Sequence, residues 1–279
     1  MPPPNGAWSA ARVNSLGLIA GNGVFPLEVA DAARRRGIRV IAIAHLRETR
    51  AELAARVDEI TWIKVGELEK MIAEFRRAGV TEVAMAGGIS RERLKDSFAP
   101  DARAIKMLSA IGRMSDDAVL RGVAGEIEAE GITVIDPVPM VENCLAHPGL
   151  AAGPEPTEGQ LRDLDLAFAV ARQLGSFDIG QTVAVRDGIV GAVEAVEGTD
   201  AALRRAARLV GARLVIAKAA KPGQDLRFDR PAIGPETIAL VAEIGAAMLG
   251  IEAGVTLVLE RERTLELAAQ SKVSLYGHV

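Results

Sequence analysis

The segment KPGQDLRFDRPAIGP, residues 221–235, gathers charged side chains between prolines and glycines. It follows GARLVIAK, which is typical of a buried strand and ends on Lys218. Lys218 and Lys221 carry the charge to neutralise phosphate oxygens, and Asp225 has the oxygens to hold a divalent ion or orient water. A solvated turn would not need a lysine at the end of so apolar a strand. These residues make a catalytic loop one candidate interpretation.

The same segment also has a purely structural interpretation. Arg227 and Asp229 are two residues apart, so in an extended chain their side chains would share a face and form a pair. The residues alone leave both interpretations open.

Two glycine turns follow predicted strands, in LIAGNGVFP and in MAGGIS. Glycines at a strand-to-helix turn let backbone N–H groups approach a phosphate or ribose where the helix dipole favours negative charge. Pro26 occupies the slot of the third glycine of the dinucleotide fingerprint, which disfavours NAD but leaves other nucleotides open. Steric packing is the alternative explanation. The residues expected to contact a nucleotide are Gly21, Asn22, Gly23, Gly87 and Gly88.

Acidic residues precede two predicted helices. In VEAVEGTDAAL, Glu197 and Asp200 flank a glycine at a strand end, where two hard oxygen donors can hold Mg²⁺. The alternative is that Thr199 or Asp200 simply caps the helix. Asp116 and Asp117 also precede a helix, and an N-cap with a first-turn acid explains them. A metal or ribose contact is the alternative there.

Strands and helices alternate from residue 15 onward. SLGLIA and IRVIAIA are apolar runs typical of strands buried on both faces, and PLEVADAARRRG between them predicts a helix opened by Pro26 and closed by Gly37. Such alternation predicts an α/β fold, with a parallel sheet and a Rossmann-like arrangement. A helical apolar stripe is formed by Leu68, Met71, Ile72 and Phe75.

A change of composition divides the chain. HPGLAAGPEPTEGQ, rich in proline and glycine, predicts a linker over residues 147–160. Before it we expect a flexible leader over 1–14 and a Rossmann-like nucleotide-binding domain over 15–146. After it we expect a distinct catalytic α/β domain over 161–279. Its sheet should be mixed, because TVAVRDGIVGAVEAV predicts a hairpin.

Charge and composition narrow the function further. The chain has 279 residues and a net charge of −4, which gives no general attraction for nucleic acid. Its single cysteine excludes an internal disulfide framework, and the three histidines lack metal-ligand spacing. No apolar run reaches the roughly 18 residues of a membrane-spanning helix. We therefore expect a soluble, cytoplasmic protein.

Four stretches, LGLIAGNGVFP, AGG, VEAVEGTD and KAAKPGQDLRFDRPAIGPET, closely resemble the LpxI type of UDP-2,3-diacylglucosamine pyrophosphatases. The resemblance covers roughly residues 15–277. It implies Mg²⁺-dependent hydrolysis to UMP and 2,3-diacylglucosamine 1-phosphate in lipid A biosynthesis. It further implies that the substrate lies between the two domains and that water attacks the β-phosphorus.

The resemblance carries an essential aspartate onto Asp225. Together with the residue chemistry, it makes Asp225, Lys218 and Lys221 the expected catalytic residues. Thr199 and Gln224 join the glycine turns as expected substrate contacts. The expected ligands of Mg²⁺, or of Mn²⁺, are Asp225, Asp200 and Glu197.

Other expectations concern partners. The helix within residues 100–114 is usually explained by core packing, but it can also line an acyl-chain groove or touch anionic lipid. Peripheral contact with the cytoplasmic face of the inner membrane and a homodimer are left open. Two rival functions also remain, namely a non-catalytic sugar-nucleotide sensor and a nucleotide-dependent oxidoreductase.

Overall fold

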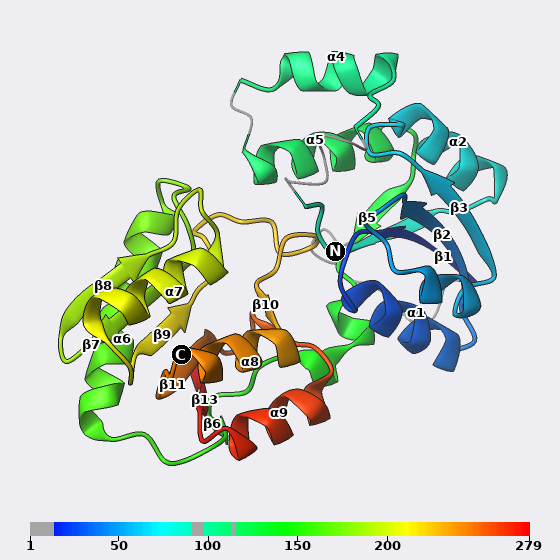
Figure 1. The fold of residues 1–279 in the computed structure, drawn as a ribbon. Helices are drawn as coiled ribbons and strands as arrows, with labels where there is room; N and C mark the ends of the chain where they lie inside the picture. Colours follow the sequence, from blue (N-terminus) through cyan, green and yellow to red (C-terminus); the bar gives the residue numbers. More distant parts are fainter. Residues whose placement is uncertain (1–13, 91–97, 113–114) are drawn as a thin grey trace, which may run out of the picture. The chain divides into compact units, whose positions relative to one another are not determined.

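A computed structural model of the chain describes residues 14–90, 98–112 and 115–279, so the leader expected over 1–14 lies outside them except for Asn14. The chain forms two compact units (Figure 1). The N-terminal unit comprises Met1–Glu142 and Asp225–Asp229, and the C-terminal unit comprises Asn143–Gln224 and Arg230–Val279. Each unit has its own sheet, parallel in the first and mixed in the second, so the predicted α/β class is confirmed.

The N-terminal unit is built on a five-stranded parallel sheet of order β3-β2-β1-β4-β5, an order found in doubly wound sheets. Strands β1 and β2 are almost continuously buried because helices cover both faces. The strands are β1 (Ser15–Ala20), β2 (Arg39–His45), β3 (Glu59–Ile63), β4 (Glu82–Ala86) and β5 (Thr133–Ile135).

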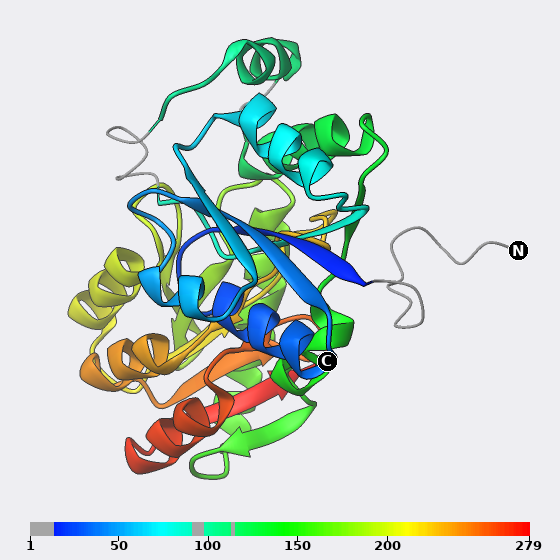
Figure 2. The same ribbon diagram turned by 90° about the vertical axis from the view of Figure 1, so that its right-hand side faces the viewer.

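Helix α1 (Phe25–Arg35) covers one face of this sheet, and α2 (Leu68–Arg77) and α5 (Asp116–Glu128) cover the other, as Figures 1 and 2 show. Helix α4 (Ala102–Ala110) packs against α2 and α5. Pro26 lies in the first turn of α1 as predicted, and the chain turns at Gly37 with a φ of +70°. The four residues of the predicted stripe on α2 are all buried, which confirms that prediction. Short 3-10 helices are η1 (Ala51–Ala55), η2 (Val138–Met140) and η3 (Glu142–Cys144).

The C-terminal unit contains a six-stranded mixed sheet of order β6-β13-β11-β9-β7-β8. The sequence predicts a linker over 147–160, but part of this stretch forms strand β6. Its backbone pairs antiparallel with β13. The predicted hairpin is present, with Asp187 and Gly188 at φ of +50° and +77° in its turn. The strands are β6 (Gly149–Ala152), β7 (Thr182–Arg186), β8 (Ile189–Val193), β9 (Val215–Lys218), β11 (Met248–Glu252) and β13 (Ser274–His278).

Helix α6 (Glu158–Gly175) packs on one face of the mixed sheet. Three helices share the core of the other face: α7 (Thr199–Val210), α8 (Pro235–Glu243) and α9 (Arg261–Gln270). A separate two-stranded parallel sheet joins β10 (Ala232–Ile233) to β12 (Leu257–Val258).

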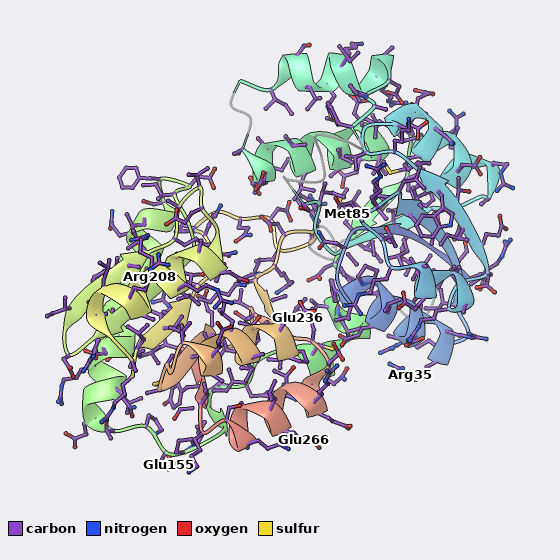
Figure 3. The ribbon with its side chains drawn as sticks, in the orientation of Figure 1. Arg35, Met85, Glu155, Arg208, Glu236 and Glu266 are labelled. Atoms are coloured by element: carbon purple, nitrogen blue, oxygen red, sulfur yellow. The ribbon has the colours of Figure 1, made fainter. Side chains whose placement is uncertain are left out.

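Side chains follow the expected division between core and surface. In Figure 3, Met85 of β4 lies inside the N-terminal unit, whereas Arg35 extends outward from the end of α1. Among the helices of the described residues, none combines the length and the apolar character needed to cross a membrane.

Candidate functional site

The two glycine turns lie side by side because β1 and β4 are neighbouring parallel strands. The N–H of Gly21 donates to the carbonyl of Ala86 over 2.8 Å, and that of Asn22 donates to the carbonyl of Gly88 over 2.7 Å. A Cβ atom on Gly21 would overlap the Gly88 carbonyl oxygen, and one on Gly87 would overlap the Asn22 carbonyl oxygen. Close approach of two backbones therefore requires glycine at positions 21 and 87. A phosphate or ribose contact here stays a prediction.

Glu48, which sequence reasoning missed, joins the two turns. Its Oε2 accepts hydrogen bonds from Asn22 Nδ2 and from Ser90 N, each over 3.1 Å. The Asn22 side chain is thus held by the protein itself. Gly23 and Gly88 are less crowded than their neighbours: a Cβ on Gly23 meets nothing within 4 Å, and one on Gly88 comes only within 3.5 Å of Asn22 Oδ1. In the sequence, Glu48 is marked only by its position just beyond a buried strand. An ordinary surface glutamate would have the same position, so nothing in the sequence singles it out.

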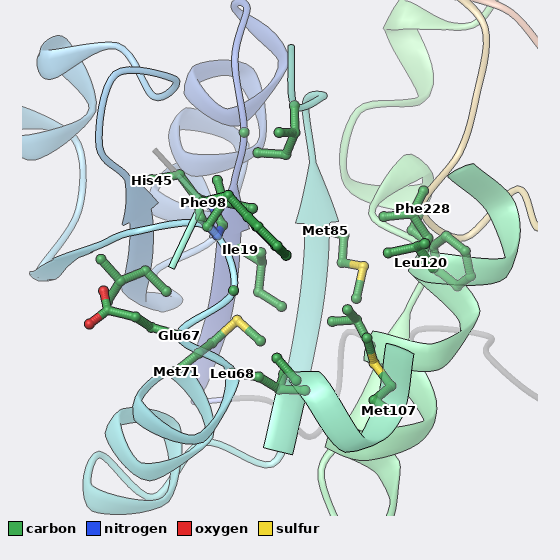
Figure 4. Close-up of a pocket in the computed structure, with 18 of the residues that line it drawn as sticks. Ile19, His45, Glu67, Leu68, Met71, Met85, Phe98, Met107, Leu120 and Phe228 are labelled. Atoms are coloured by element: carbon green, nitrogen blue, oxygen red, sulfur yellow. The ribbon is translucent and has the colours of Figure 1, made fainter. Parts of the chain in front are cut away.

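An apolar pocket of about 170 Å³ lies in the N-terminal unit, next to the glycine turns (Figure 4). Side chains from β1 and β4 and from α2, α4 and α5 form its walls, together with one aromatic ring from the segment Asp225–Asp229. The residues that define its walls include Ile19, Met71, Met85, Met107, Leu120 and Phe228.

One titratable group in the pocket wall, His45, is held by the protein. Its Nδ1 donates to the Ala20 carbonyl over 2.9 Å, and the Thr49 hydroxyl donates to the same oxygen over 2.6 Å. Burial lowers the pKa of His45, against smaller opposing effects of the Ala20 bond and of Glu48. The ring is therefore neutral at physiological pH and suits an apolar wall.

The segment Asp225–Asp229 belongs to the N-terminal unit, although the sequence on both sides of it belongs to the C-terminal unit. The N–H groups of Phe228 and Asp229 donate to the Asp225 carbonyl over 3.3 and 3.0 Å. Residues 225–229 thus form a tight turn. The prediction that Arg227 and Asp229 share a face required an extended segment here. The turn brings the Arg227 side chain onto Asp225.

Arg227 connects the turn to the rest of the N-terminal unit. Its Nε lies 3.1 Å from Asp225 Oδ1, and its Nη2 lies 2.9 Å from Asp225 Oδ2. Its Nη1 donates to Glu128 Oε1 over 2.9 Å and to the Val134 carbonyl over 3.3 Å. The guanidinium therefore fixes the Asp225 carboxylate against α5 and β5 with fork geometry.

Asp117 gives a second attachment for the same turn. The N-cap of α5 is Ser115, and Asp117 lies in the first helical turn, so the predicted first-turn acid is confirmed. Asp117 Oδ1 accepts from Asp225 N over 3.3 Å, and its Oδ2 accepts from Arg121 Nε over 2.7 Å. Arg121 Nη1 also lies 3.6 Å from Asp225 Oδ2. Two guanidinium groups thus face the Asp225 carboxylate.

These cations set the charge of Asp225. The hydrogen bond from Arg227 is the largest influence and lowers the pKa of the Asp225 carboxyl, while partial burial opposes it. The same contact raises the pKa of Arg227. Asp225 is therefore an ionised, oriented carboxylate at neutral pH.

Lys218 lies at the end of β9 in the C-terminal unit, where its Nζ donates to the Ala232 carbonyl over 2.8 Å. Thr182 of β7 is directly opposite Lys218 in the antiparallel pair, so their side chains share one face of the sheet. Burial lowers the pKa of Lys218, whereas the carboxylates of Glu194 and Asp200 raise it. The lysine therefore lies in a polar cluster at the carboxyl end of its strand.

Glu194, and not Glu197, is the inward-facing carboxylate of the segment VEAVEGTD. The Thr199 hydroxyl donates to Glu194 Oε1 over 2.8 Å, and Gln181 N donates to Oε2 over 3.4 Å. Glu197 pairs with Arg205 Nη2 over 2.6 Å, and this bond is the main reason that the pKa of Glu197 is lowered. Sequence reasoning missed Glu194. The signal was its position two residues after the buried Ala192, just past the end of β8, which puts both side chains on one face of an extended chain.

Lys221 and Gln224 stabilise their own loop in the C-terminal unit. Lys221 Nζ forms an ion pair with Asp178 Oδ1 over 2.6 Å, and Gln224 Oε1 accepts from Lys221 N over 2.9 Å. Their expected roles in catalysis and substrate binding stay predictions.

The expected metal ligands are not gathered within either unit. Asp225 belongs to the N-terminal unit, whereas Glu197 and Asp200 belong to the C-terminal unit. Across residues 14–90, 98–112 and 115–279, no group of three or more His, Cys, Asp or Glu side chains is placed to hold a metal ion. Asp117 and Asp225 face guanidinium groups, which is a poor arrangement for a divalent cation that needs several oxygen ligands. The need for Mg²⁺ stays a prediction.

The fold and the side chains define a two-unit α/β protein with an apolar pocket, an oriented carboxylate and a partly buried lysine. Comparison with known families agrees over both halves of the chain. Residues 15–144 match the LpxI N-terminal domain, and residues 147–276 match the LpxI C-terminal domain. The chain belongs to the LpxI family.

A curated relative is the UDP-2,3-diacylglucosamine pyrophosphatase LpxI of Caulobacter vibrioides. It is 38% identical over 267 residues, which cover 92% of this chain and 94% of the relative. Among solved structures, the urea amidolyase of K. lactis aligns with a TM-score of 0.29 and 14% identity over 61% of this chain and 8% of that one. Pyruvate carboxylase of Rhizobium etli aligns with a TM-score of 0.29 and 15% identity over 63% of this chain and 14% of that one. Such scores establish no common fold.

Proposed function

We propose that this protein hydrolyses the pyrophosphate bond of UDP-2,3-diacylglucosamine to give UMP and 2,3-diacylglucosamine 1-phosphate. Family membership and the activity for which the Caulobacter relative is named support this choice of substrate. The observation that carries the proposal is that Asp225 and the pocket residue Phe228 lie on one tight turn. This places a charged group suited to phosphorus chemistry beside an apolar site suited to a lipid.

The pocket is the proposed site for an acyl chain of the substrate. Its walls are almost entirely aliphatic, thioether or aromatic, and the His45 ring in them is neutral. Its volume of about 170 Å³ is comparable to an engineered apolar cavity of about 150 Å³ in another protein, which stays dry and binds benzene. Part of a fatty acyl chain is an occupant of suitable size and polarity.

The charged residues are the proposed machinery for the pyrophosphate. In the reaction, the oxygen of water bonds to one phosphorus, the bridging oxygen leaves on the other, and a proton is released. Asp225 is proposed to orient the water, because it is ionised and held by Arg227. Lys218 and Lys221 are proposed to offset phosphate charge. Mg²⁺ is a further proposal, supported by the family resemblance and not by ligand geometry.

A peripheral contact with membrane lipid on the cytoplasmic side is proposed as well. Phe98 and Ile89 both line the apolar pocket, yet 44% and 37% of their surfaces stay exposed. Exposed apolar side chains at the edge of such a pocket suit a substrate that is drawn from a bilayer.

The direct test incubates the purified protein with UDP-2,3-diacylglucosamine in detergent micelles with Mg²⁺ and measures UMP over time. We expect UMP and 2,3-diacylglucosamine 1-phosphate in equal amounts, and loss of both with the Asp225→Asn variant. Tight substrate binding without any release of UMP would contradict the proposed enzymatic activity and would support a sugar-nucleotide sensor.

A further inference from the structure

The turn Asp225–Asp229 joins the carboxylate of Asp225 to the ring of Phe228. The N–H groups of Phe228 and Asp229 both donate to the Asp225 carbonyl, over 3.3 and 3.0 Å. Arg227 N donates to Asp225 Oδ1 over 3.1 Å, so the Asp225 side chain also stabilises the turn. Three hydrogen bonds within five residues make this turn one small rigid piece. A backbone shift at Phe228 would therefore be transmitted to Asp225.

Phe228 forms part of the wall of the apolar pocket. It packs, partly buried, against the core of the N-terminal unit, as do Leu120 and Val123 of α5. Figure 4 shows Phe228 beside Leu120, across the pocket from Ile19 and Met71. The guanidinium of Arg227 lies 5.5 Å from the centre of the Phe228 ring. The ring thus contacts the apolar pocket and also the cation that holds Asp225.

Side-chain contacts attach the turn to α5 and β5. The bonds are Arg227 Nη1 to Glu128 Oε1 at 2.9 Å, Arg227 Nη1 to the Val134 carbonyl at 3.3 Å, and Asp225 N to Asp117 Oδ1 at 3.3 Å. All of these are polar contacts at partly or fully exposed positions. Phe228, by contrast, attaches the turn to the N-terminal unit through apolar packing. A ligand that fills the pocket beside Phe228 would add apolar contacts to this side chain.

We infer that Phe228 is a specificity-determining residue, which couples an acyl chain in the pocket to the placement of Asp225. The inference rests on the proposed function, because it takes the acyl chain of the substrate as the occupant. An acyl chain packed on the ring holds the whole turn, and with it the carboxylate, in the position needed at the pyrophosphate. Binding energy from a remote part of the substrate then raises kcat and does not only lower KM. The enzyme would in this way favour acylated sugar nucleotides over those without acyl chains.

Leu120→Ala is the matched control for Phe228→Ala, because both side chains are partly buried and both line the pocket, but Leu120 is not on the turn. With UDP-2,3-diacylglucosamine, we expect Phe228→Ala to lower kcat by about tenfold or more. We expect Leu120→Ala to raise KM with a kcat within about threefold of wild type, since it removes only binding surface. Equal effects of the two variants on kcat and KM would overturn the inference. Phe228→Leu, which keeps part of the apolar side chain, should lower kcat by a factor between those of Leu120→Ala and Phe228→Ala, and it replaces Phe228→Ala if that variant fails to fold.

Hydrogen exchange provides a readout that does not need turnover. We expect 2,3-diacylglucosamine 1-phosphate to slow exchange of the Phe228 and Asp229 amides in wild type by about tenfold, and glucosamine 1-phosphate to leave it unchanged. The slowing should persist in Leu120→Ala at saturation, be smaller in Phe228→Leu and disappear in Phe228→Ala. Unchanged exchange in wild type with the acylated ligand would overturn the coupling even if hydrolysis is observed. Slowed exchange without hydrolysis would sustain the coupling and contradict the proposed reaction.

Discussion

Arg227 holds both carboxylate oxygens of Asp225, with Nε 3.1 Å from Oδ1 and Nη2 2.9 Å from Oδ2. The remaining nitrogen of the guanidinium is bonded to Glu128, on a helix that the chain completes about a hundred residues earlier. The pair therefore orients a carboxylate and attaches its turn to the N-terminal unit through a single side chain. The consequences of this relationship can be measured.

The first prediction concerns turnover in Asp225→Asn. The change keeps the shape of the side chain and removes its negative charge, so the charge that is proposed to orient the water is lost. We expect kcat to fall by at least about a hundredfold, as when one electrostatic catalytic group is removed. The measurement is kcat beside the circular dichroism spectrum and the substrate dissociation constant of the same preparation. A folded variant with normal kcat would exclude a catalytic role for Asp225.

The second prediction concerns stability in acid. Because Arg227 lowers the pKa of Asp225 below its unfolded value of about 3.9, the native state binds fewer protons than the unfolded state. The stabilisation is then complete above that unfolded pKa and is lost as the pH falls through the lowered native pKa. Asp225→Asn should therefore have a free energy of unfolding about 1–2 kcal/mol lower than wild type at pH 7, and the difference should shrink as the pH falls below the unfolded pKa of Asp, about 3.9. Urea unfolding across pH measures it, and a difference independent of pH would contradict the assignment.

The third prediction compares two glycines of one turn. A methyl group on Gly21 overlaps the Gly88 carbonyl, whereas one on Gly23 meets open space but has an unfavourable φ of +82°. We expect Gly21→Ala to lower the free energy of unfolding by about 3 kcal/mol or more, because backbone must move. Gly23→Ala should cost only about 1 kcal/mol. Equal costs, measured by urea unfolding, would show that the turns do not pack as described.

The fourth prediction separates Glu194 from Glu197. The carboxylate of Glu194 raises the pKa of Lys218 against the lowering by burial, so Glu194→Gln should lower that pKa further. Glu197→Gln is the control, because Glu197 is paired with Arg205 and should leave the pKa of Lys218 unchanged. NMR titration of the lysine Cε and Nζ signals, with Lys218→Arg for assignment, gives the values. A larger shift from Glu197→Gln would reverse the assignment of the two glutamates.

The fifth prediction concerns metal removal. We expect EDTA to abolish hydrolysis of UDP-2,3-diacylglucosamine, and added Mg²⁺ or Mn²⁺ to restore it, as the family resemblance implies. EDTA already saturated with Mg²⁺ is the control for nonspecific inhibition. Full turnover in EDTA with metal-free substrate would remove the divalent cation from the mechanism. That result would leave the guanidinium and lysine side chains as the cations available to the pyrophosphate.

The secondary structure could be predicted from the sequence because its signals are local. Pro26 opens α1, and the Asp187–Gly188 turn takes the positive φ values that join β7 to β8. The apolar stripe of α2 is buried because its spacing matches the period of a helix. The segment 221–235 could also be singled out as a candidate site from its lysines and aspartate after a buried strand, and its catalytic role stays a prediction. The family resemblance rests on the same stretches and is confirmed.

Tertiary structure alone decided which groups meet. Asp225 bonds to Asp117 across 108 positions of sequence, and Arg227 bonds to Val134 across 93, so no local pattern could place the turn in the N-terminal unit. Glu48 and Glu194 were missed because each has a partner from a distant segment, Asn22 for Glu48 and Gln181 for Glu194. The pocket likewise exists only once β1, β4, three helices and Phe228 are packed together. A hydrogen bond or a cavity depends on distances in space, and spacing along the chain determines those distances only within a single helix, strand or turn.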